Sequence, residues 1–180
     1  MKNGFTLIEL LTVVFIIGVM SMIIFVNYRN SGEKFALQRS ANSLLQSIRM
    51  AEGMATNSQK FGTAYPSGGY GISLTKGSDS TNYTVFADVN NPPNHSYDIG
   101  EEVGGLGKFE SSVKVSGLLP GVAGDNLTII FQAPDPKVIF YGDSGEISTE
   151  ITDVSIILTN PKNNETKTVK INKAGLIYVE

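Results

Sequence analysis

The order of apolar and polar positions divides the chain into three parts, and the first is a long uncharged segment. A short polar stretch, residues 1–4, precedes it, and residues 10–28 are 19 positions without a charge. At ~1.5 Å per residue, a helix of this length measures about 28 Å. This is close to the ~30 Å thickness of the hydrocarbon layer of a bilayer. The segment therefore predicts a helix that spans a membrane.

A second apolar pattern follows with the spacing of an α-helix. Steps of three and four residues place its members on one stripe of the helix surface. No proline occurs before Pro66, so we expect one long helix, with Gly18 and residues 30–32 as the points where it bends or loosens. The stripe is expected to pack against a sheet of the same chain. It consists of Leu37, Ala41, Leu44, Ile48, Ala51 and Ala55.

Beyond about residue 60, short apolar runs and alternating positions predict β-strands separated by glycine-rich and asparagine-rich turns. The alternation at Val113/Val115 and Val169/Ile171 favours antiparallel sheets with one solvated face. The predicted fold class is α+β, with a long N-terminal helix packed on a C-terminal antiparallel β-sheet domain. Strands are expected at residues 70–75, 83–88, 112–116, 127–132, 137–141, 154–159, 168–172 and 176–179.

Three interpretations of the N-terminus compete. Lys2 and the apolar run fit a secretory signal, but residues 21–28 offer no cleavage site of the A-x-A type. A plain membrane anchor explains the span but gives no reason for Glu9, an acid inside the start of an apolar segment where a charge is costly. The third interpretation accounts for the acid and for the residues before it.

Residues 2–11, Lys-Asn-Gly-Phe-Thr-Leu-Ile-Glu-Leu-Leu, resemble the processing site of type IV pilins and type II secretion pseudopilins. The resemblance implies that a prepilin peptidase cuts after Gly4 and methylates the new amino group of Phe5. It implies a role in assembly for Glu9. It also implies the partners: other pilin or pseudopilin subunits in a homo- or hetero-oligomeric fibre, the prepilin peptidase, and an inner-membrane assembly platform.

Cleavage after Gly4 would give Glu9 a physical purpose. It creates a positive amine one helical turn from the acid, where the amine of a neighbouring subunit could meet the carboxylate. Such a pair removes the penalty of an uncompensated charge in an apolar bundle, and a carboxylate also suits a helix N-terminus. The alternative is that Glu9 extends to the membrane interface without a partner. We prefer the pair because it explains the acid and the cleavage site together.

The resemblance extends to domain organisation and location. It implies a leader peptide at residues 1–4, a transmembrane and polymerisation helix at 5–28, an amphipathic helix at 29–57 and a β-rich globular domain at 58–180. The protein would be a single-pass inner-membrane protein with an extracytoplasmic domain, later part of a fibre. The C-terminal strands resemble those of H-type minor pseudopilins and FimT-like proteins. The chain departs from many pilins by lacking cysteine and a proline late in the span.

Charge and composition argue against other classes of function. The formal net charge of −3 disfavours nucleic-acid binding. Without cysteine and with one histidine, thiol chemistry and histidine-cluster metal sites are excluded, and His95 is expected to be a solvated loop residue. Residues 104–109 superficially resemble the end of a phosphate-binding loop. The full pattern, G-x-x-x-x-G-K-[ST], would need glycine in place of Glu102 and a hydroxyl residue in place of Phe109, so we predict a flexible loop instead. We therefore predict a non-enzymatic protein. The alternative to a fibre subunit is a membrane-anchored extracytoplasmic binding module that does not polymerise.

One segment, residues 88–102, predicts a calcium site. It carries the oxygen-bearing side chains Asp88, Asn90, Asp98 and Glu101 on a loop, and hard oxygen ligands suit Ca²⁺. It also resembles the D-x-N … Y-D-x-G-E loops of some exported pilin-like and repeat proteins. The alternative is a solvated turn rich in aspartate and asparagine. No other cofactor is expected.

Overall fold

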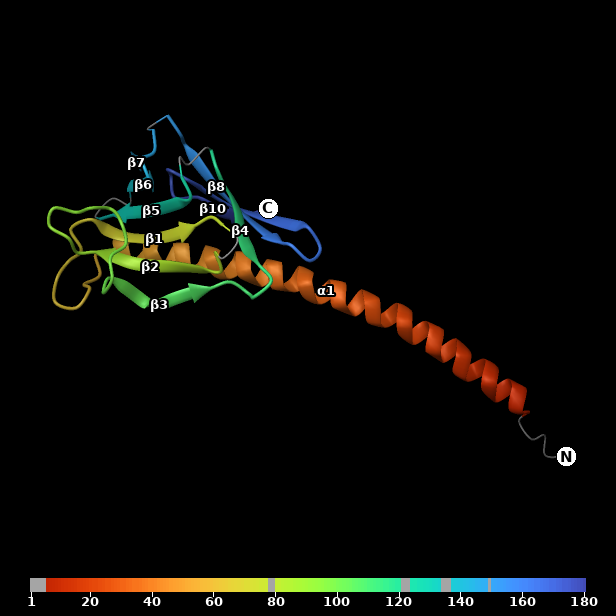
Figure 1. Cartoon of the computed structure of the whole chain (residues 1–180). Helices are drawn as coiled ribbons and strands as arrows, with labels where there is room; N and C mark the ends of the chain where they lie inside the picture. The colour runs from red at the N-terminus through yellow and green to blue at the C-terminus, as the bar shows by residue number, and fades with distance from the viewer. Residues whose placement is uncertain (1–5, 78–79, 121–123, 134–136, 149) are drawn as a thin grey trace.

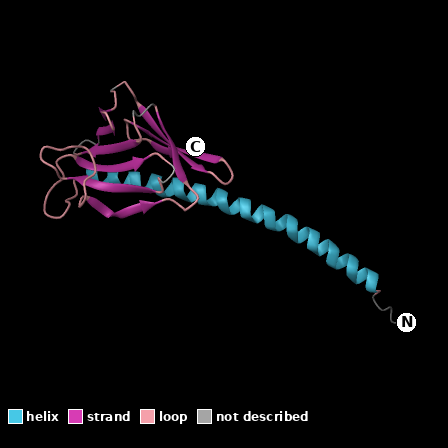
Figure 2. Ribbon diagram, in the orientation of Figure 1, coloured by secondary structure: helices cyan, strands magenta, loops and turns pink. Residues whose placement is uncertain are grey.

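A computed structural model shows one long helix whose C-terminal half carries two antiparallel β-sheets, whereas its N-terminal half projects away from them (Figures 1 and 2). The structure describes residues 6–77, 80–120, 124–133, 137–148 and 150–180, and for residues 26–31 it describes the backbone alone. This arrangement confirms the predicted α+β class with a long N-terminal helix packed on antiparallel sheets.

The helix, α1 (Leu7–Thr56), is 50 residues long and is unbroken. Gly18 and residues 30–32, expected as weak points, are both helical. The helix curves gently along its length (Figure 1). It ends at Asn57 as the cap, and Ser58 takes a positive φ of 45° while its N–H donates to the carbonyl of Ala55. The chain then turns back toward the first strand.

The larger sheet has six strands in the order β3-β2-β1-β5-β6-β7, all antiparallel to their neighbours. The central position of β1 explains its near-complete burial. The strands are β1 (Gly69–Thr75), β2 (Asn82–Asp88), β3 (Glu102–Lys108), β5 (Asn126–Gln132), β6 (Lys137–Gly142) and β7 (Gly145–Glu146).

The smaller sheet has four strands in the order β10-β9-β8-β4. In β8 buried and less buried residues alternate strictly, as expected of a sheet with one covered face. The strands β9 and β10 form an antiparallel hairpin. The strands are β4 (Lys114–Leu119), β8 (Asp153–Asn160), β9 (Glu165–Asn172) and β10 (Ile177–Val179).

Two strands were not predicted. The prediction of a flexible loop at residues 104–109 is wrong, because Gly104 to Lys108 belong to the edge strand β3. Its glycines have low intrinsic strand preference, but pairing with β2 supplies the hydrogen bonds. Gly104 and Gly105 have φ of 74° and 84° beside an irregularity in the register between the two strands. The short β7 lies in a segment for which no strand was expected.

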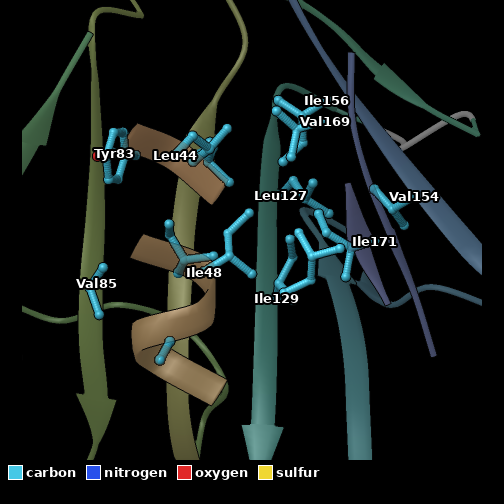
Figure 3. Packing of buried hydrophobic residues seen from close by; sticks show 14 of the residues in the cluster. Leu44, Ile48, Tyr83, Val85, Leu127, Ile129, Val154, Ile156, Val169 and Ile171 are labelled. Atoms are coloured by element: carbon cyan, nitrogen blue, oxygen red, sulfur yellow. The ribbon is translucent and has the colours of Figure 1, made fainter. Parts of the chain in front are cut away.

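The core forms where the second half of α1 meets both sheets. The predicted stripe is confirmed: all six of its residues are buried, none with more than 2% of its surface exposed. Figure 3 shows Leu44 and Ile48 of the helix between β2, which contributes Tyr83 and Val85, and β5, which contributes Leu127 and Ile129. Val154, Ile156, Val169 and Ile171 of the smaller sheet continue the same cluster.

Candidate functional site

The first functional feature is the exposed apolar half of α1. A candidate membrane span covers Leu7–Phe25, and none of it is buried within the chain. Large side chains such as Phe15 and Ile24 are 70% and 68% exposed. A contiguous apolar surface of this size is rare on a monomer in water and marks a membrane or protein contact. Lipid or other helices must therefore cover it.

The start of this helix is closed by a capping box between Thr6 and Glu9. The backbone N–H of Glu9 donates to Thr6 Oγ1 at 3.3 Å, and the backbone N–H of Thr6 donates to Glu9 Oε2 at 3.0 Å. The Thr6 hydroxyl also donates to the same carboxylate oxygen at 2.9 Å. The reciprocal bonds satisfy two backbone N–H groups that would otherwise lack a partner at the helix start.

The predicted processing residues adjoin this cap. Gly4 and Phe5 lie outside the described residues, and Glu9 occupies the first turn of α1. Its pairing with the amine of a neighbouring subunit stays a prediction. The contact with Thr6 was missed by the sequence analysis, although the spacing Thr-x-x-Glu at residues 6–9 is the signature of a capping box. Within one chain, the acid therefore already has partners.

A second cluster joins the helix to the smaller sheet just beyond the span. Glu33 accepts hydrogen bonds from Lys162 Nζ at 2.8 Å and from Asn160 Nδ2 at 2.8 Å. Bonds from Lys162, Asn160 and Ser112 lower the pKa of Glu33 from 4.5 to about 2. Asn160 is fully buried, so this junction is fixed by directed bonds as well as by packing. It sets the position at which the projecting helix leaves the domain.

Ion pairs and hydroxyl contacts continue this attachment along α1. Arg39 Nε lies 2.7 Å from Glu110 Oε1, and this contact lowers the pKa of the Glu110 carboxyl. The hydroxyl of Tyr83 lies 3.0 Å from the hydroxyls of both Ser43 and Ser47. Because α1 is bonded to the smaller sheet through Asn160 and to the larger sheet through Tyr83, the projecting half has a defined direction relative to the domain.

The loop predicted to bind calcium is held by its own carboxylates. Asp88 is fully buried and accepts hydrogen bonds from the backbone N–H groups of His95 at 2.8 Å and Asn90 at 3.2 Å. Glu101 accepts from the N–H groups of Val89 and Asp98 at 3.2 and 3.0 Å. Burial, with the nearby charges of Asp88 and Asp98, raises the pKa of Glu101. These two acids therefore brace the loop from inside.

The other two predicted ligands lie against each other at the loop surface. Asp98 Oδ2 accepts from the side-chain amides of Asn90 and Asn94, each at 2.7 Å. In the part of the chain that the structure describes, no three aspartate, glutamate, histidine or cysteine side chains are grouped so that they could hold a metal ion. The calcium site stays a prediction from the sequence.

The prediction of a solvated His95 is wrong. Its side chain is 18% exposed, and its ring stacks on that of Tyr141 with centroids 4.8 Å apart. Its Nδ1 atom is buried and lies 3.4 Å from Asp88 Oδ2, outside good hydrogen-bonding geometry. The loop folds back over the larger sheet, which sequence spacing cannot reveal.

Comparison with known proteins bears on the N-terminal segment. Residues 1–25 match the family model described as the prokaryotic N-terminal methylation motif. Searches of the curated proteins and of the solved structures gave no match. The matched residues contain the predicted cleavage position, Glu9 and the apolar span through Phe25.

The chain therefore carries a prepilin segment of the type IV pilin and pseudopilin kind, followed by a pilin-like α+β fold. Such a segment indicates a pilin-type subunit that is processed by prepilin peptidase and associates with other pilin subunits. It also indicates a membrane-anchored protein with a structural role.

Proposed function

We propose that the mature chain is a non-enzymatic subunit of a helical fibre, either a type IV pilus or a type II secretion pseudopilus. Prepilin peptidase cuts between Gly4 and Phe5 and methylates the Phe5 amine. Before assembly, the subunit is anchored in the inner membrane with its β-domain on the extracytoplasmic side. Other proteins of the assembly platform then extract it into the fibre.

The observation that carries this proposal is the complete exposure of the span beside a well-buried domain core. No residue of Leu7–Phe25 is buried by the chain itself. In the second half of the same helix, by contrast, the apolar stripe is buried against two sheets. The span can therefore exchange lipid for the spans of neighbouring subunits without disturbing the domain. A helix that served the domain alone would bury its apolar residues against it.

In this proposal, Glu9 fixes the position of each span relative to the spans of neighbouring subunits. Its carboxylate lies in the first helical turn beside Thr6, the residue that follows the new N-terminus. When spans pack together in an apolar bundle, a charged carboxylate needs a charged partner, and the methylated amine of an adjacent subunit supplies it. Before assembly, the capping bonds to Thr6 hold the carboxylate of Glu9 at the helix start, where the amine of the adjacent subunit can bind it.

Mass spectrometry of the mature protein tests the processing step. The expected N-terminus is a methylated Phe5 in cells that contain a prepilin peptidase, and an intact Met1 in cells that lack it. Protein that keeps Met1 in the presence of the peptidase and still functions as a monomer would favour the non-polymerising binding module.

Two substitutions separate the charge of Glu9 from its capping bonds. Glutamine also serves in a capping box, so Glu9→Gln keeps the cap but removes the charge, whereas Thr6→Ala removes the hydroxyl of the cap but keeps the charge. We expect Glu9→Gln to lower fibre incorporation at least tenfold and Thr6→Ala to lower it much less, as measured by immunoblotting of sheared fibres. Equal incorporation of Glu9→Gln and wild type would rule out the charge pair.

A further inference from the structure

The outer face of the larger sheet, opposite the face that covers α1, carries a row of hydroxyl side chains. Thr84 of β2 is in register with Ser73 of β1, Ser73 with Thr128 of β5, and Thr128 with Tyr141 of β6. Residues directly opposite each other on antiparallel strands project from the same face of a sheet. Four neighbouring strands thus place four hydroxyls in one line across the sheet.

A cleft of about 520 Å³ lies over three members of this row. Ser73, Thr128 and Tyr141 line it, and the loop residues His95 and Tyr97 form one wall. The volume falls within the ~300–1,000 Å³ that is usual for small-molecule sites. In the described part of the chain, the hydroxyls of Ser73, Thr128 and Tyr141 have no side-chain hydrogen-bond partner. Ser73 and Tyr141 are partly exposed, whereas Thr128 is 7% exposed and contributes to the floor of the cleft.

The far end of the cleft is organised by a chain of bonds between three other lining residues. Thr75 Oγ1 donates to Asn126 Oδ1 at 2.8 Å, and Asn126 Nδ2 donates to Asp143 Oδ1 at 2.6 Å. Asp143 Oδ2 also accepts the backbone N–H groups of Asp125 and Asn126, and these contacts, led by the Asn126 side chain, lower the pKa of Asp143. The polar groups here are thus oriented before any ligand enters, which reduces the entropy that binding costs.

The chemistry of the lining narrows the class of ligand. Among the described residues that line the cleft, none is lysine or arginine and one is a carboxylate, so an anionic group such as phosphate or sialic acid has no counter-charge. Hydroxyl and amide groups dominate the lining, which disfavours a lipid tail. The rings of Tyr97 and Tyr141 add apolar faces between polar groups. A neutral polyhydroxylated molecule offers matching donors, acceptors and C–H faces.

We propose that this cleft binds a neutral saccharide unit through the hydroxyl row on β1, β5 and β6. The site lies on the face of the larger sheet opposite α1, and none of its lining residues belongs to the span Leu7–Phe25. The ligand is a sugar without an acidic substituent, either free or as part of a glycan.

The test uses the full chain in detergent micelles and does not require fibre formation. Saturation-transfer NMR is recorded with glucose, galactose, mannose, N-acetylglucosamine and N-acetylgalactosamine at millimolar concentration, with sialic acid and glucose 6-phosphate as anionic comparisons. A glycan array then separates attached from free sugars by competition with the best free sugar. Thr128→Val and Ser73→Ala remove hydroxyls of the row, and Thr168→Val makes the same Thr-to-Val change on β9, away from the cleft.

We expect at least one neutral sugar to bind, and Thr128→Val and Ser73→Ala each to weaken binding up to about tenfold, the effect of one lost hydrogen bond. Thr168→Val should bind as wild type does. Circular dichroism establishes that each variant is folded, and Ser73→Ala keeps the test informative if Thr128→Val unfolds. Absence of transfer to every neutral sugar, preference for the anionic sugars, or equal binding by all variants would overturn the proposal.

Discussion

The ring of Tyr83 occupies the space beside Gly107, its register partner on the edge strand β3, so that a Cβ at Gly107 would overlap Tyr83 Cε2. The hydroxyl at the other end of that ring lies 3.0 Å from Ser43 and from Ser47 on α1. Its ring also contacts Phe109 with centroids 5.0 Å apart. One tyrosine thus connects the docked helix, β2 and the end of β3, and it requires a glycine opposite.

This relationship predicts that Gly107→Ala destabilises the domain. An added methyl group must displace a buried ring, and overpacking of this kind typically costs about 1–3 kcal/mol. The thermal midpoint of the full chain in detergent, followed by circular dichroism, should fall. Gly53→Ala is the control, because a Cβ at this position meets nothing within 4 Å. The substitution also replaces a glycine inside a helix by alanine, a better helix former. It should gain about 0.5–1 kcal/mol. Equal midpoints for the two variants would contradict the packing described above.

The two halves of α1 should respond differently to the same substitution. Leu44 is 0% exposed in the core, so Leu44→Ala should cost about 2–5 kcal/mol and lower the thermal midpoint. Leu11 is 59% exposed in the span, so Leu11→Ala should leave domain stability nearly unchanged and reduce incorporation into fibres. A lower midpoint for Leu11→Ala would show that the span packs on the domain.

The Glu33 junction predicts a loss of stability in acid. Because the folded state lowers the pKa of Glu33 to about 2, the ionised carboxylate stabilises the fold above its ordinary value of 4.5. That contribution disappears as the pH falls from about 4.5 through 2. Glu33→Gln should therefore be less stable than wild type at pH 7, and the difference should shrink toward pH 2, as measured by thermal midpoints across this range. Glu150→Gln, which changes an exposed acid, is the control, and a constant difference across the range would argue against the linkage.

The calcium prediction has its own test on the 88–102 loop. The sequence expectation is a heat of binding in calorimetry of the full chain with millimolar Ca²⁺, together with a rise in thermal midpoint by mass action. Asp88 and Asp98 are expected to carry most of the affinity, so Asp98→Asn, which changes an exposed carboxylate, and Asp88→Asn should each remove most of both effects. Absence of heat at millimolar Ca²⁺ in the folded wild-type protein would remove the site and leave the loop as the hydrogen-bonded brace seen in the structure.

Local patterns were sufficient for the elements whose neighbours along the chain decide their structure. The uncharged run predicted the span, and the spacing from Leu37 to Ala55 predicted the buried face of the helix, because a helix repeats every 3.6 residues whatever lies beyond it. Most strands were predicted from their short apolar runs and alternating positions, because successive side chains of a strand point to opposite faces. The processing motif is likewise a linear signal, and the match over residues 1–25 depends on the order of residues alone.

Contacts between distant segments were decided only by the tertiary structure. The glycine-rich strand β3 exists because β2 supplies its hydrogen bonds, and His95 is covered because its loop folds onto Tyr141. The hydroxyls of Ser73, Thr128 and Tyr141 form a row only through strand register. The sequence by itself determined that the apolar N-terminal half of the helix must be covered by lipid or by other chains. The direction of that helix, and the polar cleft on the opposite face of the sheet, follow from pairings that a linear pattern does not contain, because hydrogen bonds between strands join residues far apart in the chain.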